Sequence, residues 1–144
     1  MILFAALFFL GSAARVQAQT LTLEVRDIDR PTGTLYVAIY SSPDNFLKKP
    51  LTGVQAEVKD KQMFIPCQGL SAGTYALCLF HDVNGNGTLD TGTYGIPAEP
   101  TGFSNDAVGV MGSPTFEQCS FTLRQDTTVV VHLKRYSKTG VPSF

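Results

Sequence analysis

The chain has 144 residues, a formal net charge of −1 and 44% hydrophobic residues. This length suits one domain with its own hydrophobic core. A charge so close to zero argues against nucleic acid or an anionic membrane surface as the partner, because both are bound through a basic face.

The N-terminus has the pattern of a secretory signal. Residues 1–10 form an unbroken apolar run, and the small-residue site Val16-Gln17-Ala18 follows. This pattern predicts cleavage directly after that site. The run is too short to cross a bilayer as a helix, which takes about 20 apolar residues. We therefore expect a signal peptide at 1–18, no transmembrane segment, a secreted or periplasmic domain at 19–136 and a C-terminal tail at 137–144.

Short stretches in which apolar and polar residues alternate predict β-strands along most of the chain. In the first, Leu21, Leu23 and Val25 alternate with polar residues, which is the period of a half-buried strand. One later stretch, 74–80, is apolar on both faces and is expected to be a central strand. The expected strands lie at 21–26, 35–40, 54–58, 63–65, 74–80, 116–123 and 129–133, with a brief helical turn near 46–48.

No amphipathic run is long enough for a major helix. Short strands separated by turn residues favour an all-β fold, a seven-stranded antiparallel β-sandwich of the immunoglobulin-like or prealbumin-like kind. A small closed barrel is the alternative. One long Gly/Asp-rich loop interrupts the strands between 82 and 114, and an ordered loop of this length is usually functional. Its apolar residues predict that it packs on the sandwich rather than being disordered.

The charges are distributed unevenly. No Lys or Arg occurs from residue 62 to residue 123, whereas this interval contains Asp82, Asp90, Glu99, Asp106 and Glu117. Carboxylates held together without a nearby base repel one another unless a cation or protons compensate them. Basic residues from elsewhere in the chain could still fold over them.

The spacing within the loop suggests which cation. Asp82, Asn84 and Asn86 recur at every second residue and Gly87 follows, as at the start of an EF-hand calcium loop. The expected bidentate Glu is replaced by Thr93, and no flanking helices are predicted, so the segment is not an EF-hand. A remote carboxylate would have to complete an oxygen-only shell around calcium. The predicted ligands are Asp82, Asn84, Asn86, Thr88, Asp90 and Glu99.

A metal-free explanation of the same loop stays open. Asn-Gly pairs are turn residues, and Asx side chains accept hydrogen bonds from their own backbone without any metal. Other cations than calcium are a further alternative.

Three other kinds of site are considered. His81, Asp82 and Glu99 could serve a metal-dependent enzyme or a metal carrier, with His132 as a second histidine. Tyr94 and Phe103 could bind carbohydrate, although the absence of Trp weakens this hypothesis. Ser104 is not in a nucleophile-elbow sequence. We expect a non-enzymatic binding or structural module with an unidentified ligand or envelope partner.

The three cysteines, Cys67, Cys78 and Cys119, have no metal or redox spacing. One disulfide with one free thiol is possible and three pairings are open, but small buried apolar residues are the favoured interpretation.

Four motifs in order carry a family resemblance. They are the Gly73-Thr74-Tyr75-Ala76 strand start, the loop from His81 to Asp90, the step Gly95-Ile96-Pro97-Ala98-Glu99, and the step Gly102-Phe103-Ser104-Asn105. With these motifs the chain resembles the bacterial exported family called domain of unknown function 2141, over about residues 21–133. Pro100-Thr101 departs from the aromatic residue that often precedes Gly102 in that family. The resemblance implies a small secreted or periplasmic β domain and implies no activity, substrate or cofactor.

Overall fold

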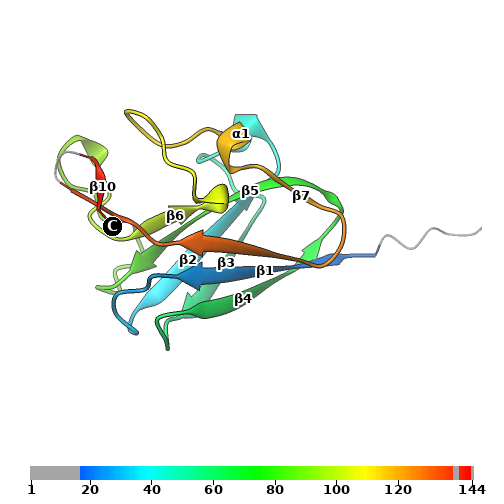
Figure 1. Ribbon diagram of the computed structural model, residues 1–144, viewed down its shortest axis with the longest axis horizontal. Coiled ribbons are helices and arrows are strands. Elements are labelled where there is room, and N and C mark those ends of the chain that lie inside the picture. The colour runs from blue at the N-terminus through cyan, green and yellow to red at the C-terminus, as the bar shows by residue number, and fades with distance from the viewer. Residues whose placement is uncertain (1–16, 138–139, 144) are drawn as a thin grey trace, which may run out of the picture.

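The computed structural model describes residues 17–137 and 140–143, so nearly all of the expected signal peptide lies outside the described residues. The chain forms an open β-sandwich of two sheets, with long loops gathered along one side (Figure 1). The strands are β1 Gln19–Arg26, β2 Thr34–Tyr40, β3 Thr52–Glu57, β4 Met63–Leu70, β5 Gly73–Asp82, β6 Thr101–Phe103, β7 Phe121–Leu123, β8 Thr127–His132, β9 Arg135–Tyr136 and β10 Pro142–Ser143.

The smaller sheet has the strand order β4-β1-β8, and the larger one has the order β3-β2-β5-β6 with β7 also paired to β5. All of these pairs are antiparallel, as expected, except β1 with β8. In the parallel pair Leu23 lies beside Val129, while on its other side it faces Ile65 of β4. A parallel neighbour requires a long crossover connection, and here most of the chain lies between the two strands.

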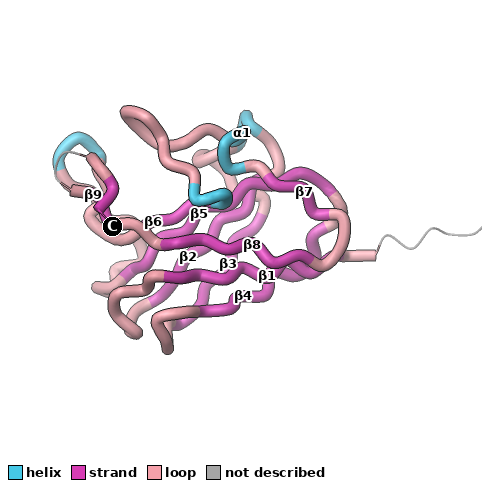
Figure 2. The backbone as a smooth tube through the Cα atoms, viewed as in Figure 1, coloured by secondary structure: helices cyan, strands magenta, loops and turns pink. Residues whose placement is uncertain are grey.

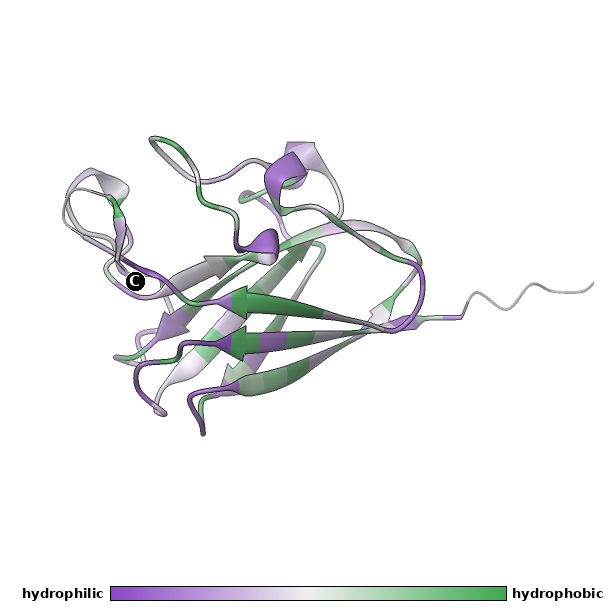
Figure 3. Cartoon of the chain, in the orientation of Figure 1, coloured by the Kyte–Doolittle hydropathy of each residue, from purple (hydrophilic) through white to green (hydrophobic). Residues whose placement is uncertain are grey.

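The predicted alternation of the strands builds the core. Leu21, Leu23 and Val25 are completely buried between the sheets, and Thr22 and Glu24 between them lie on the opposite face of the strand, where Glu24 is also covered. Leu35 and Ile39 of β2 are completely buried as well. Figure 3 shows hydrophobic residues concentrated along the strands. The expected sandwich is therefore confirmed.

The strand β5 lies in the middle of the larger sheet and is covered on both faces, as its sequence predicts. Leu77 and Leu79 pack in the main core between the sheets. Ala76 and Cys78 point to the other side, where a second hydrophobic cluster forms beneath the long loops. This second cluster consists of Tyr40, Phe46, Ala76, Phe116 and Cys119, with Ala38, Cys78, Phe103 and Ala107 packed against it.

Helical structure occurs only as short turns in the described residues, visible in Figure 2. The expected strand signal at Phe116 is wrong, because Phe116–Cys119 is a single helical turn, α1. A capping box explains it: Thr115 and Gln118 bond each other's backbone. Three 3-10 turns lie at Pro43–Asn45, Thr93–Gly95 and Ser104–Asp106, the first of them earlier than the expected turn near 46–48.

The long interval after β5 is ordered and packs on the sandwich, as expected. It contains β6, which the sequence analysis missed, because its three residues show no alternation of their own. This strand pairs with β5 through Leu79 and Gly102 and returns the chain to the sheet. The strand β10 lies in the expected tail and pairs with β9, which precedes the tail.

Candidate functional site

The loop that follows β5 is held by the first of its predicted site residues. Asp82 is the last residue of β5 and only 1% exposed. Its carboxylate accepts two backbone hydrogen bonds, from Gly85 N to Oδ1 and from Gly87 N to Oδ2, each 2.8 Å long. Both glycines have positive φ, +75° and +76°. Because L side chains rarely adopt that conformation, the Gly residues allow the backbone to wind around the Asp82 carboxylate.

The next residues converge on Asp90. Asn84 donates a hydrogen bond from Nδ2 to Oδ2 of Asp90 at 2.5 Å, and Asn86 donates from Nδ2 to Oδ1 at 2.7 Å. The same side chains also accept hydrogen bonds from backbone groups two residues further on. Asn84 Oδ1 accepts from Asn86 N, and Asn86 Oδ1 accepts from Thr88 N. These are Asx turns, so the local sequence itself dictates this part of the geometry.

Glu99 closes the loop from a distance. It is 7% exposed, and its two carboxylate oxygens accept from Val83 N and Asp90 N, both at 3.1 Å. The backbone beside it bonds back as well, from Ala98 N to Asp90 O at 2.8 Å. Glu99 thus joins the two arms of the loop through backbone N–H groups, whereas the sequence analysis names it as the remote carboxylate that would complete a cation shell.

Among the described residues, the three carboxylates of this loop have hydrogen-bond donors and no ion-pair partner. The ion pairs formed within residues 17–137 and 140–143 involve other acids, namely Glu24, Glu57, Asp106 and Asp29. Within this part of the chain, hydrogen bonds from backbone N–H groups and Asn amides compensate the charge of Asp82, Asp90 and Glu99. The described residues contain no group of three or more His, Cys, Asp or Glu side chains arranged for a metal. Any cation shell here would thus have to include Asn and backbone oxygens.

His81 points away from this loop and into the sandwich. Its side chain is fully buried, and its Nε2 lies 2.6 Å from the carbonyl oxygen of Thr32. A carbonyl only accepts, so Nε2 carries the proton. The other ring nitrogen, Nδ1, is buried without a hydrogen-bond partner. The structure therefore does not bring His81 together with Asp82 and Glu99 as a solvent-facing group.

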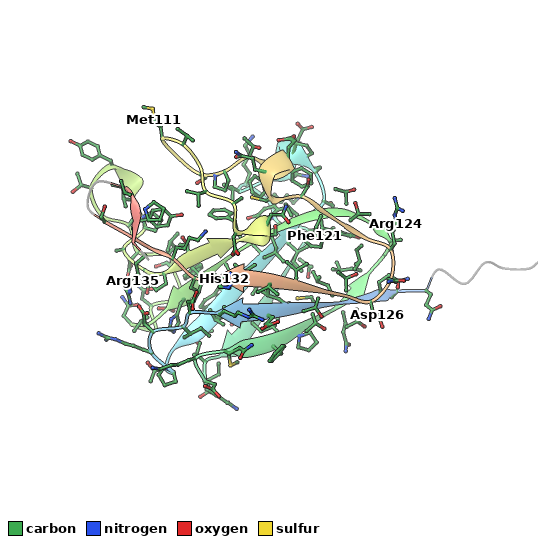
Figure 4. The ribbon with its side chains drawn as sticks, in the orientation of Figure 1. Met111, Phe121, Arg124, Asp126, His132 and Arg135 are labelled. Atoms are coloured by element: carbon green, nitrogen blue, oxygen red, sulfur yellow. The ribbon has the colours of Figure 1, made fainter. Side chains whose placement is uncertain are left out.

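The second histidine, His132, lies outside the 82–105 loop and pairs with Asp106. His132 Nδ1 bonds Asp106 Oδ2 at 2.7 Å, and the other oxygen of Asp106 accepts from His132 N at 2.8 Å. This pair lies at the end of β8, beside an open depression of about 700 Å³, where Figure 4 labels His132 and Arg135. The depression is lined by Asp27, Asp29, Pro100, Asp106, His132, Leu133, Lys134 and Arg135. Sequence reasoning missed it, because no spacing links Asp106 to His132.

The two aromatic residues considered for carbohydrate binding, Tyr94 and Phe103, differ in solvent exposure. Tyr94 is 95% exposed on the turn at Thr93–Gly95. Phe103, by contrast, is half-buried and packs against the second hydrophobic cluster. They offer one exposed aromatic face rather than a paired platform.

Ser104 is fully buried and has a structural role. Its Oγ accepts from Leu77 N at 3.0 Å and donates to the carbonyl oxygen of Cys119 at 2.5 Å. The hydroxyl thus links the central strand β5 to the helical turn α1.

Comparisons with known proteins place the chain in one family. The family model described as "Uncharacterized protein conserved in bacteria (DUF2141)" matches residues 23–131. Searches of curated proteins and of solved structures found no match. Within the described residues, no helix is both long and apolar enough to span a membrane. Since the match covers most of the chain, the protein belongs to the bacterial DUF2141 family.

Proposed function

We propose that this protein is an exported, non-enzymatic binding or structural module whose 82–105 loop is stabilised by one bound calcium ion. The observation that carries the calcium proposal is the convergence of Asn84 and Asn86 on the carboxylate of Asp90. Asn84 and Asn86 are two residues apart and Asp90 follows four residues later, in a loop whose backbone winds around the Asp82 carboxylate. The loop therefore gathers oxygen-bearing groups at one point without a basic residue among them.

The chemistry of the donors suits a hard cation. Calcium takes six to eight oxygen ligands, including carboxylates, Asn carbonyls and backbone carbonyls. The Oδ1 atoms of Asn84 and Asn86 accept one backbone N–H each, and a carbonyl oxygen has a second lone pair that would face the ion after a rotation of the side chain toward it. Thr88 would contribute its backbone carbonyl, while Asp82 and Glu99 keep the two arms of the loop in place. The ion would supply the positive charge that the base-free interval lacks.

The buried state of His81 supports the non-enzymatic part of the proposal. A general acid or base must reach the proton that it transfers, and the imidazole of His81 is fully buried against Thr32. The alternatives are a metal-dependent enzyme or carrier using His81, Asp82 and Glu99, and a carbohydrate-binding module. The first would require His81 to leave the interior. The second would rest on the single exposed ring of Tyr94.

The proposal is tested by thermal unfolding of the purified protein with millimolar calcium and with chelator, alongside elemental analysis. We expect calcium to raise Tm by about 5–10 °C, because an ion that binds only the folded state stabilises it by about 2.7 kcal/mol at a hundredfold excess over Kd. The response should be lost in Asp82→Ala. Because Asp82 also holds the backbone, Asp90→Asn is the milder variant and should lose the response as well.

Glu117→Gln is the matched control, since Glu117 is an exposed acid of the same base-free interval outside the loop. It should respond as the wild type does. Identical melting curves of the wild type with calcium and with chelator would contradict the calcium proposal and leave the hydrogen-bonded Asx loop as the explanation. A response to magnesium or manganese alone would contradict it too.

A further inference from the structure

The second hydrophobic cluster contains two of the three cysteines. Cys78 reaches it from the central strand β5, and Cys119 reaches it from α1 as a completely buried residue. The cluster lies on the outer face of the larger sheet, beneath the segment 104–120. Two segments that lie about 40 residues apart in sequence thus pack in the same cluster, and both cysteines are free thiols in the structure.

The third cysteine is on the opposite side of that sheet. Cys67 of β4 packs in the main core, between the two sheets, and its Sγ bonds the carbonyl oxygen of Ile65. Side chains of adjacent strand residues point to opposite faces, so Leu77 and Leu79 face Cys67 while Cys78 faces away. The larger sheet therefore separates Cys67 from both other cysteines, and one of the three possible pairings remains.

Hydrogen bonds hold the backbone of Cys119 against β5. The hydroxyl of Ser104 bridges Leu77 N and the carbonyl oxygen of Cys119. Asn105 adds two bonds from its Nδ2, to the carbonyl oxygens of Gln118 and Ser120 at 3.1 Å and 2.8 Å. The residues directly before and after Cys119 are thus tied to the same short turn, and Leu77 immediately precedes Cys78.

The thiols also interact electrostatically. Burial, together with a smaller effect of the nearby Cys78, raises the pKa of Cys119 to about 12. Burial likewise raises the pKa of Cys78 to about 11. Since the thiolate is the form that attacks a disulfide, both residues react slowly once the cluster has closed over them. Oxidation would have to occur while the chain folds.

We propose that Cys78 and Cys119 form a disulfide in the exported protein, with Cys67 left as a buried free thiol. The two thiols lose two protons and two electrons, a sulfur–sulfur bond forms, and the disulfide of a thiol oxidoreductase accepts the electrons and becomes a dithiol. This inference rests on the export that we propose above. The bond fastens α1 to β5 and encloses both the 82–105 loop and the turn at Ser104–Asp106 in one covalent ring.

The test is refolding of the purified, reduced protein in a buffer of oxidised and reduced glutathione with chelator present, followed by alkylation. We expect a product lighter by two hydrogens, with a single alkylated cysteine. Trypsin alone is uninformative, because no Lys or Arg separates the three cysteines. Cyanogen bromide cuts after Met63 and Met111 and separates Cys119 from the other two. The two fragments should stay joined until a reductant is added.

Variants assign the bond. Cys67→Ala should keep the fragments joined, whereas Cys78→Ala and Cys119→Ala should release them. The oxidised wild type should melt about 10 °C above its reduced form, since a ring of about 40 residues removes much unfolded-state entropy. Fragments that separate without reductant, or a link that persists in Cys78→Ala, would overturn the proposal. Because chelator is present throughout, neither result bears on the calcium site.

Discussion

Gly33 and Asp82 approach each other so closely that a Cβ atom on Gly33 would lie 2.2 Å from the carbonyl oxygen of Asp82. Gly33 precedes β2, and its φ of +84° is in the left-handed region. The following residue, Thr34, is the register partner of Asp82. The start of β2 thus fixes the position at which the candidate calcium loop leaves β5.

This contact predicts a large effect of Gly33→Ala. A side chain at this position meets backbone atoms that cannot rotate away, and its φ is strained as well. We expect a loss of about 2 kcal/mol or more in the free energy of unfolding, measured by urea denaturation. Gly69→Ala is the matched control, because Gly69 has φ +80° and nothing within 4 Å of the added Cβ. It should cost about 1 kcal/mol, and equal losses in both variants would contradict the steric explanation.

The hydroxyl of Ser104 gives a second prediction. Removing it in Ser104→Ala leaves the buried N–H of Leu77 without its acceptor. An unsatisfied buried donor costs about 1–3 kcal/mol, and we expect a destabilisation of this size by chemical denaturation. Ser113→Ala should change stability by less than about 0.5 kcal/mol, because Ser113 is exposed. A Ser104→Ala variant as stable as Ser113→Ala would show that the bridge between β5 and α1 contributes nothing.

Glu24 gives a prediction of pH dependence. The hydrogen bond from Arg26 Nε, 2.6 Å long, lowers the pKa of the Glu24 carboxyl below its usual 4.5, with a further bond from Gln62 and an opposing effect of burial. A carboxyl whose folded pKa is lowered stabilises the fold above its unfolded pKa, and that contribution is lost as pH falls through the folded value. Stability should therefore decrease below about pH 4.5.

In Glu24→Gln this decrease should be shallower, as measured by urea unfolding across the acid range. Glu57→Gln serves as the control, since Glu57 is exposed and its partner Lys59 is 3.8 Å away. It should keep the acid dependence of the wild type. If the free energy of unfolding of Glu24→Gln decreased with falling pH as steeply as that of the wild type, Glu24 would not be the source of the acid dependence.

Several features of this protein could be read from its sequence because they depend on neighbours along the chain. The period of two in 21–26 and 35–40 places alternate residues on opposite faces, so the buried sets of β1 and β2 were predictable. The Asx turns of the 82–90 segment depend on contacts over two to five residues, and the Gly residues there permit them. The base-free interval is a property of the sequence itself.

Other features depend on which distant segments meet, and only the tertiary structure decided them. Three such features join residues that no sequence spacing relates. They are the parallel pairing of β1 with β8, the hydrogen bonds by which Glu99 joins the two arms of the loop, and the His132–Asp106 pair. The sequence placed His81 beside Asp82 without showing that strand alternation turns its ring into the core. It also left three cysteine pairings open, because a sheet that separates Cys67 from Cys78 exists only once the strands have assembled.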